Sequence, residues 1–272
     1  MPRPRLHGLD LPGPGPGRRQ GGPRQVTDHP PRPRVVAMIP TYNEAGNIGD
    51  LVAALLALPL EADLHVLVAD DNSPDGTGRL VEGMAAAEPR VHALIRTKRR
   101  GRGAAGVDGF KAALSLGADF VVEMDGDLSH QPRHIPALLA AAGEFDLVLG
   151  SRFVPGGQDA ERGLHRRVIT LFVRSFIRRL YGLSIRDVSS GFRCFRRAVL
   201  EAVDLDDLVS VGQSIVLEIL YKAHLLGFKI GEVPIEFVDR RRGETKLDFL
   251  ALLETLLMAV KFKKRYVAPI RG

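Results

Sequence analysis

The sequence predicts an α/β fold in which a mostly parallel sheet is flanked by helices on both faces. Short apolar stretches alternate with stretches of helical periodicity, and the connections between them are brief. Four of the apolar stretches end in polar or charged residues, and the carboxyl ends of parallel strands meet at one edge of a sheet. We therefore expect a ligand site along that edge.

Composition narrows the class of protein. The chain has 272 residues, 45% of them apolar and 26% charged, which suits one large globular domain or two small ones. Seven arginines against two aspartates give residues 1–34 five of the six net positive charges, so the remainder is close to neutral. This distribution weakens an argument for nucleic-acid binding from overall charge. The single cysteine, Cys194, excludes an intrachain disulfide and fits a reducing compartment.

Hydropathy indicates a chain that is soluble or peripheral to a membrane rather than integral. No stretch reaches the roughly 18 uninterrupted apolar residues of a membrane-spanning helix. The longest candidate, 249–260, contains Glu254. The N-terminal segment has arginines but lacks the apolar core of a secretory signal.

The first half of the chain has the clearest pattern. Residues 1–34 are rich in Pro, Gly and Arg and are predicted to be a disordered tail. After it, Ile48, Leu51 and Leu55 lie on one stripe of a first helix, and Thr77 is placed to cap a second. The predicted strands are 35–39, 64–69, 91–95, 120–124 and 146–149, and the predicted helices are 45–58, 77–87, 104–116 and 132–142.

The second half is less regular. A helix over 168–181 has a polar face with Arg174, Arg178 and Arg179, which we expect to be mostly solvent-exposed. Pro234 indicates that the extended segment around it is an edge strand. Further helices are predicted over 196–203, 214–226 and 247–260, with a turn and short strand at 189–193 and an extended segment at 229–238.

Two carboxylates follow the apolar strand 120–124. Asp125 and Asp127 are separated by Gly126, and residues i and i+2 of an extended chain point to the same side. Two such oxygen ligands suit Mg²⁺ or Mn²⁺ shared with a diphosphate. A short D-x-D pattern also occurs as a pair of solvated loop acids, but its place at the end of a buried strand favours a metal site.

Several segments carry a family resemblance. Residues 40–44 (Pro-Thr-Tyr-Asn-Glu), 70–77, 124–130 and 150–152 together resemble the inverting nucleotide-sugar glycosyltransferases of the GT-A fold. Residues 190–193, 227–235 and 240–247 narrow the resemblance to the dolichol-phosphate (polyprenol-phosphate) mannose synthase family. The resemblance implies a GT-A catalytic domain over 35–247 that transfers mannose from GDP-mannose to a polyprenyl phosphate. Residues 248–272 would form a separate C-terminal helix and basic tail.

The resemblance also implies roles for individual residues. The nucleotide would be bound by Pro40, Tyr42, Glu44, Ala69 and Asp71. The metal would be held by Asp125 and Asp127, with Gly126 beside them, and the donor phosphates by Arg240 and Lys246. The acceptor phosphate would be bound by Arg152 and Arg166, and the residues closest to the chemistry would be Asp127, Arg152, Arg240 and Lys246. Relative to the family pattern, Thr245 replaces Ser, Gly126 replaces Ala, and a Trp in the acceptor loop 154–167 is missing.

The expected chemistry needs no general base. A phosphate monoester is already anionic at neutral pH, because its second pKa is near 6. We therefore expect His130, beside the D-x-D motif, to be structural. A single displacement inverts the anomeric carbon, so an α-linked donor would give a β-linked product.

Three alternatives remain at this point. The donor sugar could be glucose or another sugar, because the residues do not fix it. The C-terminal helix could bind an anionic membrane surface at the cytoplasmic face, with or without a separate membrane subunit, or it could pack on the domain. The basic residues after it, Lys261, Lys263, Lys264 and Arg265, suit the first alternative. A non-catalytic nucleotide- or nucleic-acid-binding protein could use the tail and the basic run 96–102, but this run lacks interleaved aromatic residues. We expect no nucleic-acid partner.

Overall fold

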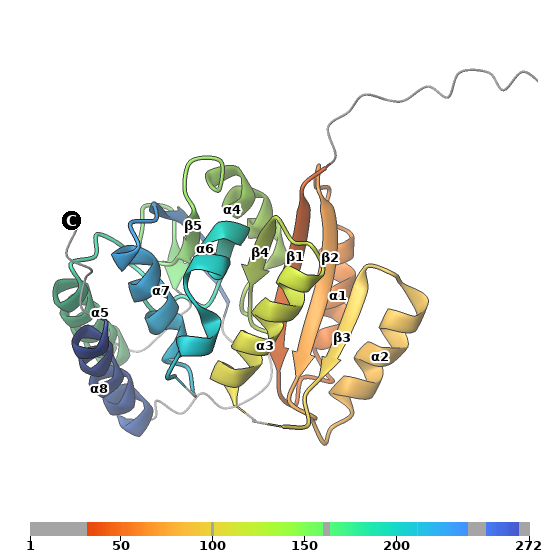
Figure 1. The fold of residues 1–272 in the computed structure, drawn as a ribbon, viewed down its shortest axis with the longest axis horizontal. Helices are drawn as coiled ribbons and strands as arrows, with labels where there is room; N and C mark the ends of the chain where they lie inside the picture. Colours follow the sequence, from red (N-terminus) through yellow and green to blue (C-terminus); the bar gives the residue numbers. More distant parts are fainter. Residues whose placement is uncertain (1–31, 99–100, 160–163, 211, 239–248, 267–272) are drawn as a thin grey trace, which may run out of the picture. The chain divides into compact units, whose positions relative to one another are not determined.

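A seven-stranded sheet organises the part of the chain that the structure describes. The computed structural model describes residues 32–98, 101–159, 164–210, 212–238 and 249–266, with only the backbone for 164–168 and 249–253. The strand order is β3 (Val91–Ile95), β2 (Asp63–Asp70), β1 (Arg34–Thr41), β4 (Phe120–Glu123), β7 (Arg193–Arg196), β5 (Leu147–Ser151) and β8 (Ile230–Pro234). Within this sheet β7 runs antiparallel to both neighbours and the other pairs are parallel, so the sheet is mostly parallel, as predicted (Figure 1).

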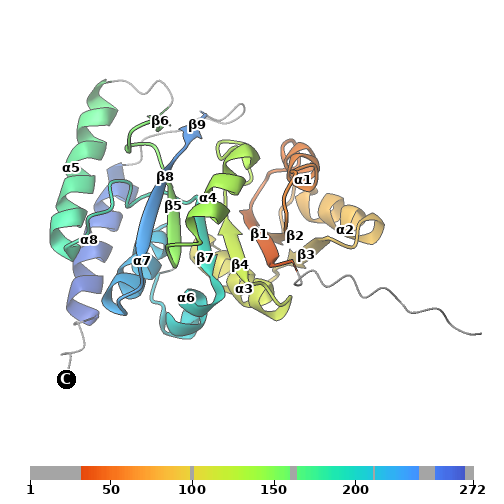
Figure 2. The ribbon, with the colours of Figure 1, turned by 90° about the horizontal axis from the view of Figure 1, so that it is seen from above.

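Helices cover both faces of the sheet, because alternate strand residues point to opposite sides. Val36 and Met38 of β1 belong to one apolar core, while Val35 and Ala37 belong to the other. The first core also takes in α3 (Arg102–Ser115), α6 (Arg197–Ala202) and α7 (Ile215–Leu225), and the second takes in α1 (Ile48–Leu56), α2 (Thr77–Ala87) and α4 (Ile135–Ala141). Figure 2 shows the two groups of helices on opposite sides of the sheet.

Two further helices pack beside α7. The backbones of α5 (Leu164–Tyr181) and α8 (Phe249–Arg265) lie side by side in Figures 1 and 2, and Tyr181 donates a 3.1 Å hydrogen bond to the carbonyl of Ala259. Phe262 is fully buried in the first core. The structure shows one side of this helix packed on the domain, and a membrane-facing role for its other side stays a prediction. The expected helix end at Val260 is wrong, because α8 continues through the basic residues to Arg265.

The helix that was expected to begin under a Thr77 cap begins differently. Gly76, with φ +93°, precedes α2 and has no side chain to cap it, and the backbone N–H of Thr77 donates to Asp75 Oδ1 at 3.0 Å. The Thr77 hydroxyl instead donates to Asp75 at 2.6 Å and accepts the backbone N–H of Glu44 at 2.9 Å. The position therefore connects two loops, which a purely local pattern does not reveal.

Other differences are small and local. The predicted helix 132–142 is a 3-10 turn, η1 (Pro132–His134), followed by α4, and a second 3-10 turn, η2 (Leu205–Asp207), follows α6. A two-stranded parallel sheet, β6 (Gln158–Asp159) with β9 (Glu236–Phe237), was not predicted. β8 lies at the edge of the main sheet, as Pro234 indicated. The predicted disordered tail, residues 1–34, lies outside the described residues up to residue 31. Its predicted end is wrong, because Arg34 is the first residue of β1 and pairs with Asp63 of β2.

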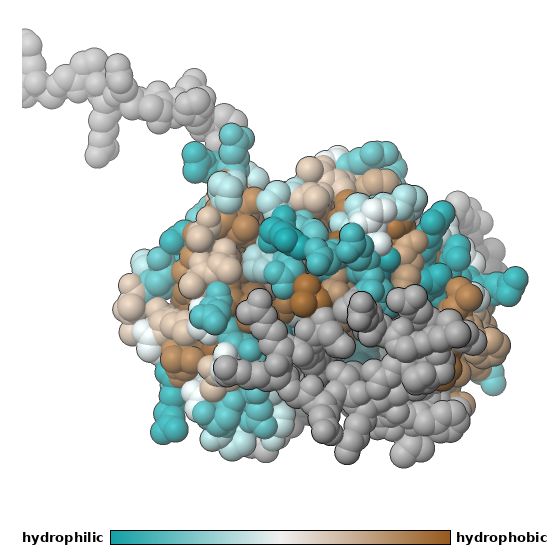
Figure 3. Space-filling view, turned by 180° about the vertical axis from the view of Figure 1, so that it is seen from behind, coloured by the Kyte–Doolittle hydropathy of each residue, from teal (hydrophilic) through white to brown (hydrophobic). Residues whose placement is uncertain are grey.

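Apolar side chains also reach the surface. The view from behind in Figure 3 mixes hydrophilic and hydrophobic residues across its coloured part. Among the described residues, the exposed large apolar side chains include Leu171, Phe172 and Phe176 of α5 and Leu257 of α8. None of the described helices combines the length and the hydropathy needed to cross a membrane.

Candidate active site

A cavity of about 350 Å³ opens at the carboxyl ends of β1, β2 and β4. We call it the sheet-edge cavity. It brings together most of the residues that the sequence placed at the nucleotide and the metal. The cavity is lined by Pro40, Thr41, Tyr42, Glu44, Asp71, Arg102, Ala105, Asp125, Gly126, Asp127 and Gln213.

The loop after β1 is held by the turn after β2. The backbone N–H groups of Glu44 and Ala45 donate to Thr77 Oγ1 at 2.9 Å and to Asp75 Oδ2 at 3.0 Å. Burial would raise the pKa of Asp75, but the hydrogen bonds from Thr77 and Ala45 outweigh it, and the pKa is lowered. These contacts fix the loop while Tyr42 stays 54% exposed, so its ring is available to a planar ligand.

Asp71 lines the cavity but already has partners. It forms an ion pair with Arg96 and accepts the backbone N–H of Gly101 at 2.7 Å. Arg96 is itself buried and also bonds Asp108 at 2.9 Å. Within the described part of the basic run 96–102, Arg96 therefore supports the site instead of forming an exposed basic surface.

Ala69 is not among the residues that line the cavity. It is fully buried in β2, and its methyl group faces α3, where a Cβ on Gly109 would lie 3.6 Å away. The residue opposite it in the register, Pro40, does line the cavity. A role for Ala69 at the nucleotide would therefore have to come from its backbone.

The two carboxylates of the D-x-D motif lie in the same cavity. Asp127 accepts from Ser129 N at 3.0 Å and Ser129 Oγ at 2.5 Å, while Asp125 Oδ1 accepts from Arg102 Nη1 at 2.6 Å. A Cβ on Gly126 would lie 3.0 Å from Thr41 Cγ2, so the glycine lets the loop pack closely.

This donor set fits a divalent ion that is shared with a ligand. Two carboxylates two residues apart face one cavity, as Mg²⁺ or Mn²⁺ requires. Across the described residues, no group of three His, Cys, Asp or Glu side chains is arranged to hold a metal by itself. Oxygen atoms of a substrate would have to complete the coordination.

His130 has a structural position, as expected from the sequence. Its Nδ1 accepts the backbone N–H of Asp125 at 3.0 Å, and its ring stacks on Phe192 with centroids 5.0 Å apart. The ring is buried, and burial lowers its pKa. A neutral imidazole that accepts at Nδ1 fixes the backbone at Asp125.

A buried polar row lies beside the D-x-D motif. Arg102 Nη2 is 3.8 Å from Glu123 Oε1, and Arg193, opposite Glu123 in the register of β4 and β7, is fully buried. Burial raises the pKa of Glu123 and lowers that of Arg193 to about 10. For Arg102, burial would lower the pKa, but the charges of Asp125 and Glu123 outweigh it and raise it. The sequence prediction missed Arg102 and Arg193, although Glu123 in an apolar strand was a signal.

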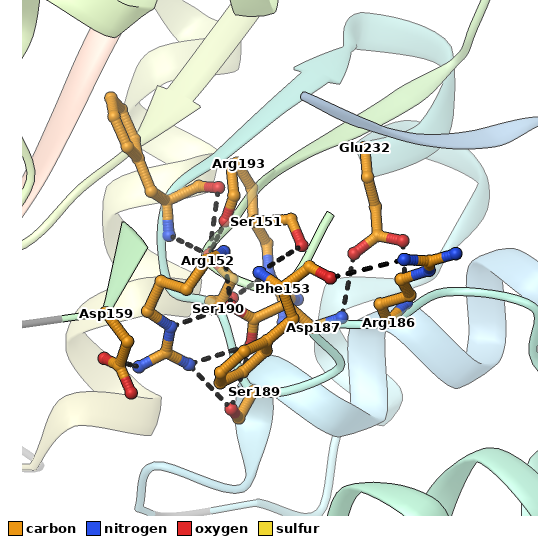
Figure 4. Close-up of polar contacts among 12 residues, drawn as sticks. Ser151, Arg152, Phe153, Asp159, Arg186, Asp187, Ser189, Ser190, Arg193 and Glu232 are labelled. Atoms are coloured by element: carbon orange, nitrogen blue, oxygen red, sulfur yellow. Dashed lines mark hydrogen bonds and ion pairs between the residues drawn. The ribbon is translucent and has the colours of Figure 1, made fainter. Parts of the chain in front are cut away.

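Arg152 is firmly held at the end of β5 (Figure 4). Its Nε and Nη2 donate to the two oxygens of the buried Asp187, each at 2.8 Å, and Nη2 also donates to Ser189 at 3.1 Å. Burial would raise the pKa of Asp187, but the bonds and the charge of Arg152 lower it. The third guanidinium nitrogen of Arg152, Nη1, lies 3.8 Å from Asp159 Oδ1.

A second cavity, of about 280 Å³, adjoins the first and shares Arg102, Asp125 and Gln213 with it. We call it the helix-side cavity. Besides Arg152 it contains apolar side chains of α5 and α7 together with several polar ones. Its other lining residues are Thr170, Val173, Arg174, Ile177, Val188, Ser189, Gly191, Val216, Leu217 and Thr255.

Arg174 corrects one expectation. It was expected to be a solvent-exposed arginine of α5, but it lines the helix-side cavity, with its guanidinium 3.9 Å above the ring of Phe153. Among the described residues its Nε is buried and has no hydrogen-bond partner. Burial and the neighbouring Arg178 and Arg152 lower its pKa. Arg174 is thus a cation that faces the helix-side cavity and not bulk solvent.

A comparison with protein families identifies the class. Residues 36–204 match the family model described as glycosyl transferase family 2, which covers more than half of the chain. The chain belongs to glycosyl transferase family 2. The expectation of a glycosyltransferase is therefore confirmed.

The names of relatives of this family 2 glycosyltransferase agree with the family resemblance inferred from the sequence motifs. An undecaprenyl-phosphate mannosyltransferase of Micrococcus luteus is 42% identical over 214 residues, which are 79% of this chain and 87% of the relative. A polyprenol monophosphomannose synthase of Mycolicibacterium smegmatis is 38% identical over 248 residues, which are 90% of this chain and 92% of the relative. The resemblance inferred from the motifs is confirmed.

Solved structures confirm the GT-A type of α/β fold. Glucosyl-3-phosphoglycerate synthase from Mycobacterium tuberculosis, in complex with Mn²⁺, UDP and glucosyl-3-phosphoglycerate, superimposes with a TM-score of 0.63. The match covers 89% of this family 2 chain and 82% of the other at 20% identity. Another structure of the same enzyme superimposes with a TM-score of 0.60.

The roles of all the predicted site residues of this glycosyltransferase stay predictions, and the structure describes no side chain for three of these residues. Arg240 and Lys246 lie outside the described residues, and so does the side chain of Arg166. The described residues bring Pro40, Tyr42, Glu44, Asp71 and the D-x-D motif together in the sheet-edge cavity, and they place Arg152 in the adjoining helix-side cavity.

Proposed function

We propose that this glycosyltransferase transfers mannose from GDP-mannose to a polyprenyl phosphate, with inversion at the anomeric carbon. The observation that carries the proposal is the pair of cavities that meet at Asp125 and Arg102. One has the exposed aromatic ring and carboxylates that suit a nucleoside diphosphate. The other has arginines beside apolar side chains of α5 and α7, which suit a lipid phosphate. The names of the relatives from M. luteus and M. smegmatis support the acceptor and the sugar.

In the sheet-edge cavity, the nucleotide would lie against Tyr42, with Glu44 and Asp71 at its polar groups. Asp125 and Asp127 would hold Mg²⁺ or Mn²⁺. The bound ion would supply positive charge against the negative charge that develops on the leaving diphosphate. The presence of Mn²⁺ with UDP in a structure of the same fold agrees with this assignment. Arg240 and Lys246 are the further candidates for the donor phosphates.

In the helix-side cavity, the acceptor phosphate would be bound by Arg152, Arg166 and Arg174. Arg152 has Nε and Nη2 committed to Asp187, while its Nη1 lies 3.8 Å from Asp159 Oδ1. The Nε of Arg174 has no hydrogen-bond partner among the described residues, so its guanidinium and Nη1 of Arg152 are candidate donors to an anion. The phosphate is already ionised at neutral pH and attacks without help from a base. His130 is buried and accepts from backbone, which agrees with a reaction that uses no histidine.

Peripheral binding to the cytoplasmic face of a membrane, with or without a separate membrane subunit, is part of the same proposal. The helices that line the acceptor cavity also expose apolar side chains, with Phe172 66% and Leu257 63% exposed. Lys263, Lys264 and Arg265 in the last turn of α8 suit anionic lipid. A Phe172→Glu variant should sediment less with vesicles that contain anionic lipid, while Leu80→Glu on α2 should not. Equal sedimentation of both variants would contradict this part.

The central experiment measures transfer of radiolabelled mannose from GDP-mannose to a short polyprenyl phosphate. Wild type and Asp127→Ala would be assayed with and without Mn²⁺, and the anomeric configuration of the product would be read by NMR. We expect metal-dependent labelling, loss of at least about 100-fold in the variant, and a β-linked product. Transfer from UDP-glucose but not from GDP-mannose would contradict the donor, and an α-linked product would contradict inversion.

A further inference from the structure

Arg102 stands at the junction of the two cavities. Its Nη1 donates to Asp125 Oδ1 at 2.6 Å, its Nη2 lies 3.8 Å from Glu123 Oε1, and its side chain is 25% exposed. It lines both the sheet-edge cavity and the helix-side cavity. The guanidinium of Arg102 is therefore hydrogen-bonded to Asp125, one of the two carboxylates to which we assign the metal.

A rigid element directs this side chain. Arg102 is the first residue of α3, and the preceding Gly101 donates its backbone N–H to Asp71. The same helix packs closely on the sheet at Gly109, where a Cβ would lie 2.7 Å from Met38 Sδ. A Cβ on Gly191 would lie 3.1 Å from Arg102 Nη2, so the glycine leaves room for the guanidinium. Arg102 is therefore positioned at Asp125 by the fold.

Two cations cannot share this carboxylate without cost. A divalent ion on Asp125 would lie close to the guanidinium that already bonds the same group. Like charges repel each other more strongly in such a partly buried site than in bulk water. A nucleoside diphosphate brings negative charge into the same cavity and would offset this repulsion. The cost of placing a metal beside Arg102 should therefore be high without the diphosphate and low with it.

We propose that Arg102 competes with the divalent ion for Asp125 and so makes tight metal binding conditional on the donor diphosphate. This inference rests on the proposed function, because it takes Asp125 and Asp127 as the metal ligands. It assigns Arg102 a positioning role: the residue sets the order and the coupling of metal and donor binding. The coupling is reciprocal, so the metal must strengthen diphosphate binding by the same factor.

The test measures binding of Mn²⁺ alone, by the EPR signal of the free ion, and of GDP with and without Mn²⁺, by calorimetry. Arg102→Met and Arg102→Gln remove the charge, Arg102→Lys keeps it, and Arg197→Met is a control at a distant ion pair with Glu201. We expect the two charge-removing variants to bind Mn²⁺ alone about tenfold more tightly than wild type, which corresponds to about 1.4 kcal/mol. The lysine variant and the control should match wild type.

The factor by which GDP strengthens Mn²⁺ binding should also fall about tenfold in the charge-removing variants. Unchanged or weaker Mn²⁺ binding in a folded Arg102→Met or Arg102→Gln protein would overturn the inference, and so would unchanged coupling. Circular dichroism and thermal unfolding establish that the variants are folded. If wild type binds no Mn²⁺ even with GDP, the metal assignment in the proposed function fails. If wild type binds it with GDP but the variants do not differ, only the role of Arg102 fails.

Discussion

The ion pair between Arg152 and Asp187 should contribute more to stability than any exposed pair of the described residues. Asp187 is fully buried and the Arg152 side chain is 9% exposed, with two bonds of 2.8 Å between them. Asp187→Ala removes both bonds and leaves a buried guanidinium with Ser189 and Asp159 beside it. Breaking such a pair costs about 3–5 kcal/mol. We expect the free energy of unfolding to fall by that amount in urea at pH 7.

The dependence on pH follows from the lowered pKa of Asp187. A carboxyl group with a lower pKa in the folded state contributes stability that is fully present above its unfolded pKa of about 4. That contribution is lost as the pH falls through the folded pKa. Between pH 5 and pH 3, wild type should therefore lose more stability than Asp187→Asn, which has no such carboxyl group.

A matched control uses the exposed pair of Arg197 with Glu201, whose side chains are 41% and 51% exposed. Glu201→Ala should change the free energy of unfolding by at most about 0.5 kcal/mol. The reasoning is refuted if Asp187→Ala loses less than about 1 kcal/mol, or if the two variants lose equal amounts. In that case the bidentate pair with Asp187 would not hold Arg152 at the helix-side cavity.

Three further predictions follow from single positions. A Cβ at Gly83, within α2, would have no heavy atom within 4 Å, so Gly83→Ala should stabilise the fold by about 0.5–1 kcal/mol. A Cβ at Gly231 would lie 2.5 Å from the Phe145 ring, so Gly231→Ala should destabilise the fold by about 1–3 kcal/mol. Thermal unfolding measures both changes. Burial lowers the pKa of His130 in the folded state, so the contribution of the neutral imidazole to stability is present above about pH 6.5 and is lost as the pH falls. In urea unfolding, the free energy of unfolding should therefore fall less between pH 7.5 and pH 5.5 in His130→Gln than in wild type. Arg174→Gln should raise the KM for polyprenyl phosphate by about tenfold or more without changing the KM for the donor.

Each of these has a clear contrary result. Equal melting temperatures for the two glycine variants would contradict the close contact at Phe145, and equal pH dependence of His130→Gln and wild type would mean that the buried imidazole is not neutral. For Arg174 the control is Arg179→Gln, an exposed arginine of the same helix. An effect of equal size in both variants, or a raised KM for the donor, would remove Arg174 from the acceptor site.

Local patterns in the sequence were sufficient for the strands of the first half and for one side of the site. Each strand of the first half could be predicted because a buried parallel strand is a short apolar run, and because its end is marked by polar residues. The D-x-D carboxylates are two residues apart, so their common direction follows from strand geometry alone. The turn chemistry around Thr77 was predicted only in part, because its hydroxyl bonds to Glu44, which lies 33 residues earlier.

The tertiary structure alone decided which charges meet. Arg102 and Asp125 are 23 residues apart, and Arg152 and Asp187 are 35 apart, so no periodicity or motif links them. Their pairing depends on the strand order, in which the antiparallel β7 is inserted between β4 and β5, and on the packing of α3 and α5 beside it. Arg174 was predicted to be solvent-exposed because helical periodicity shows which face of a helix is polar, but it does not show which elements pack against that face. The sequence by itself determined the elements and the carboxylates, and only the packed fold determined the arginines that face them.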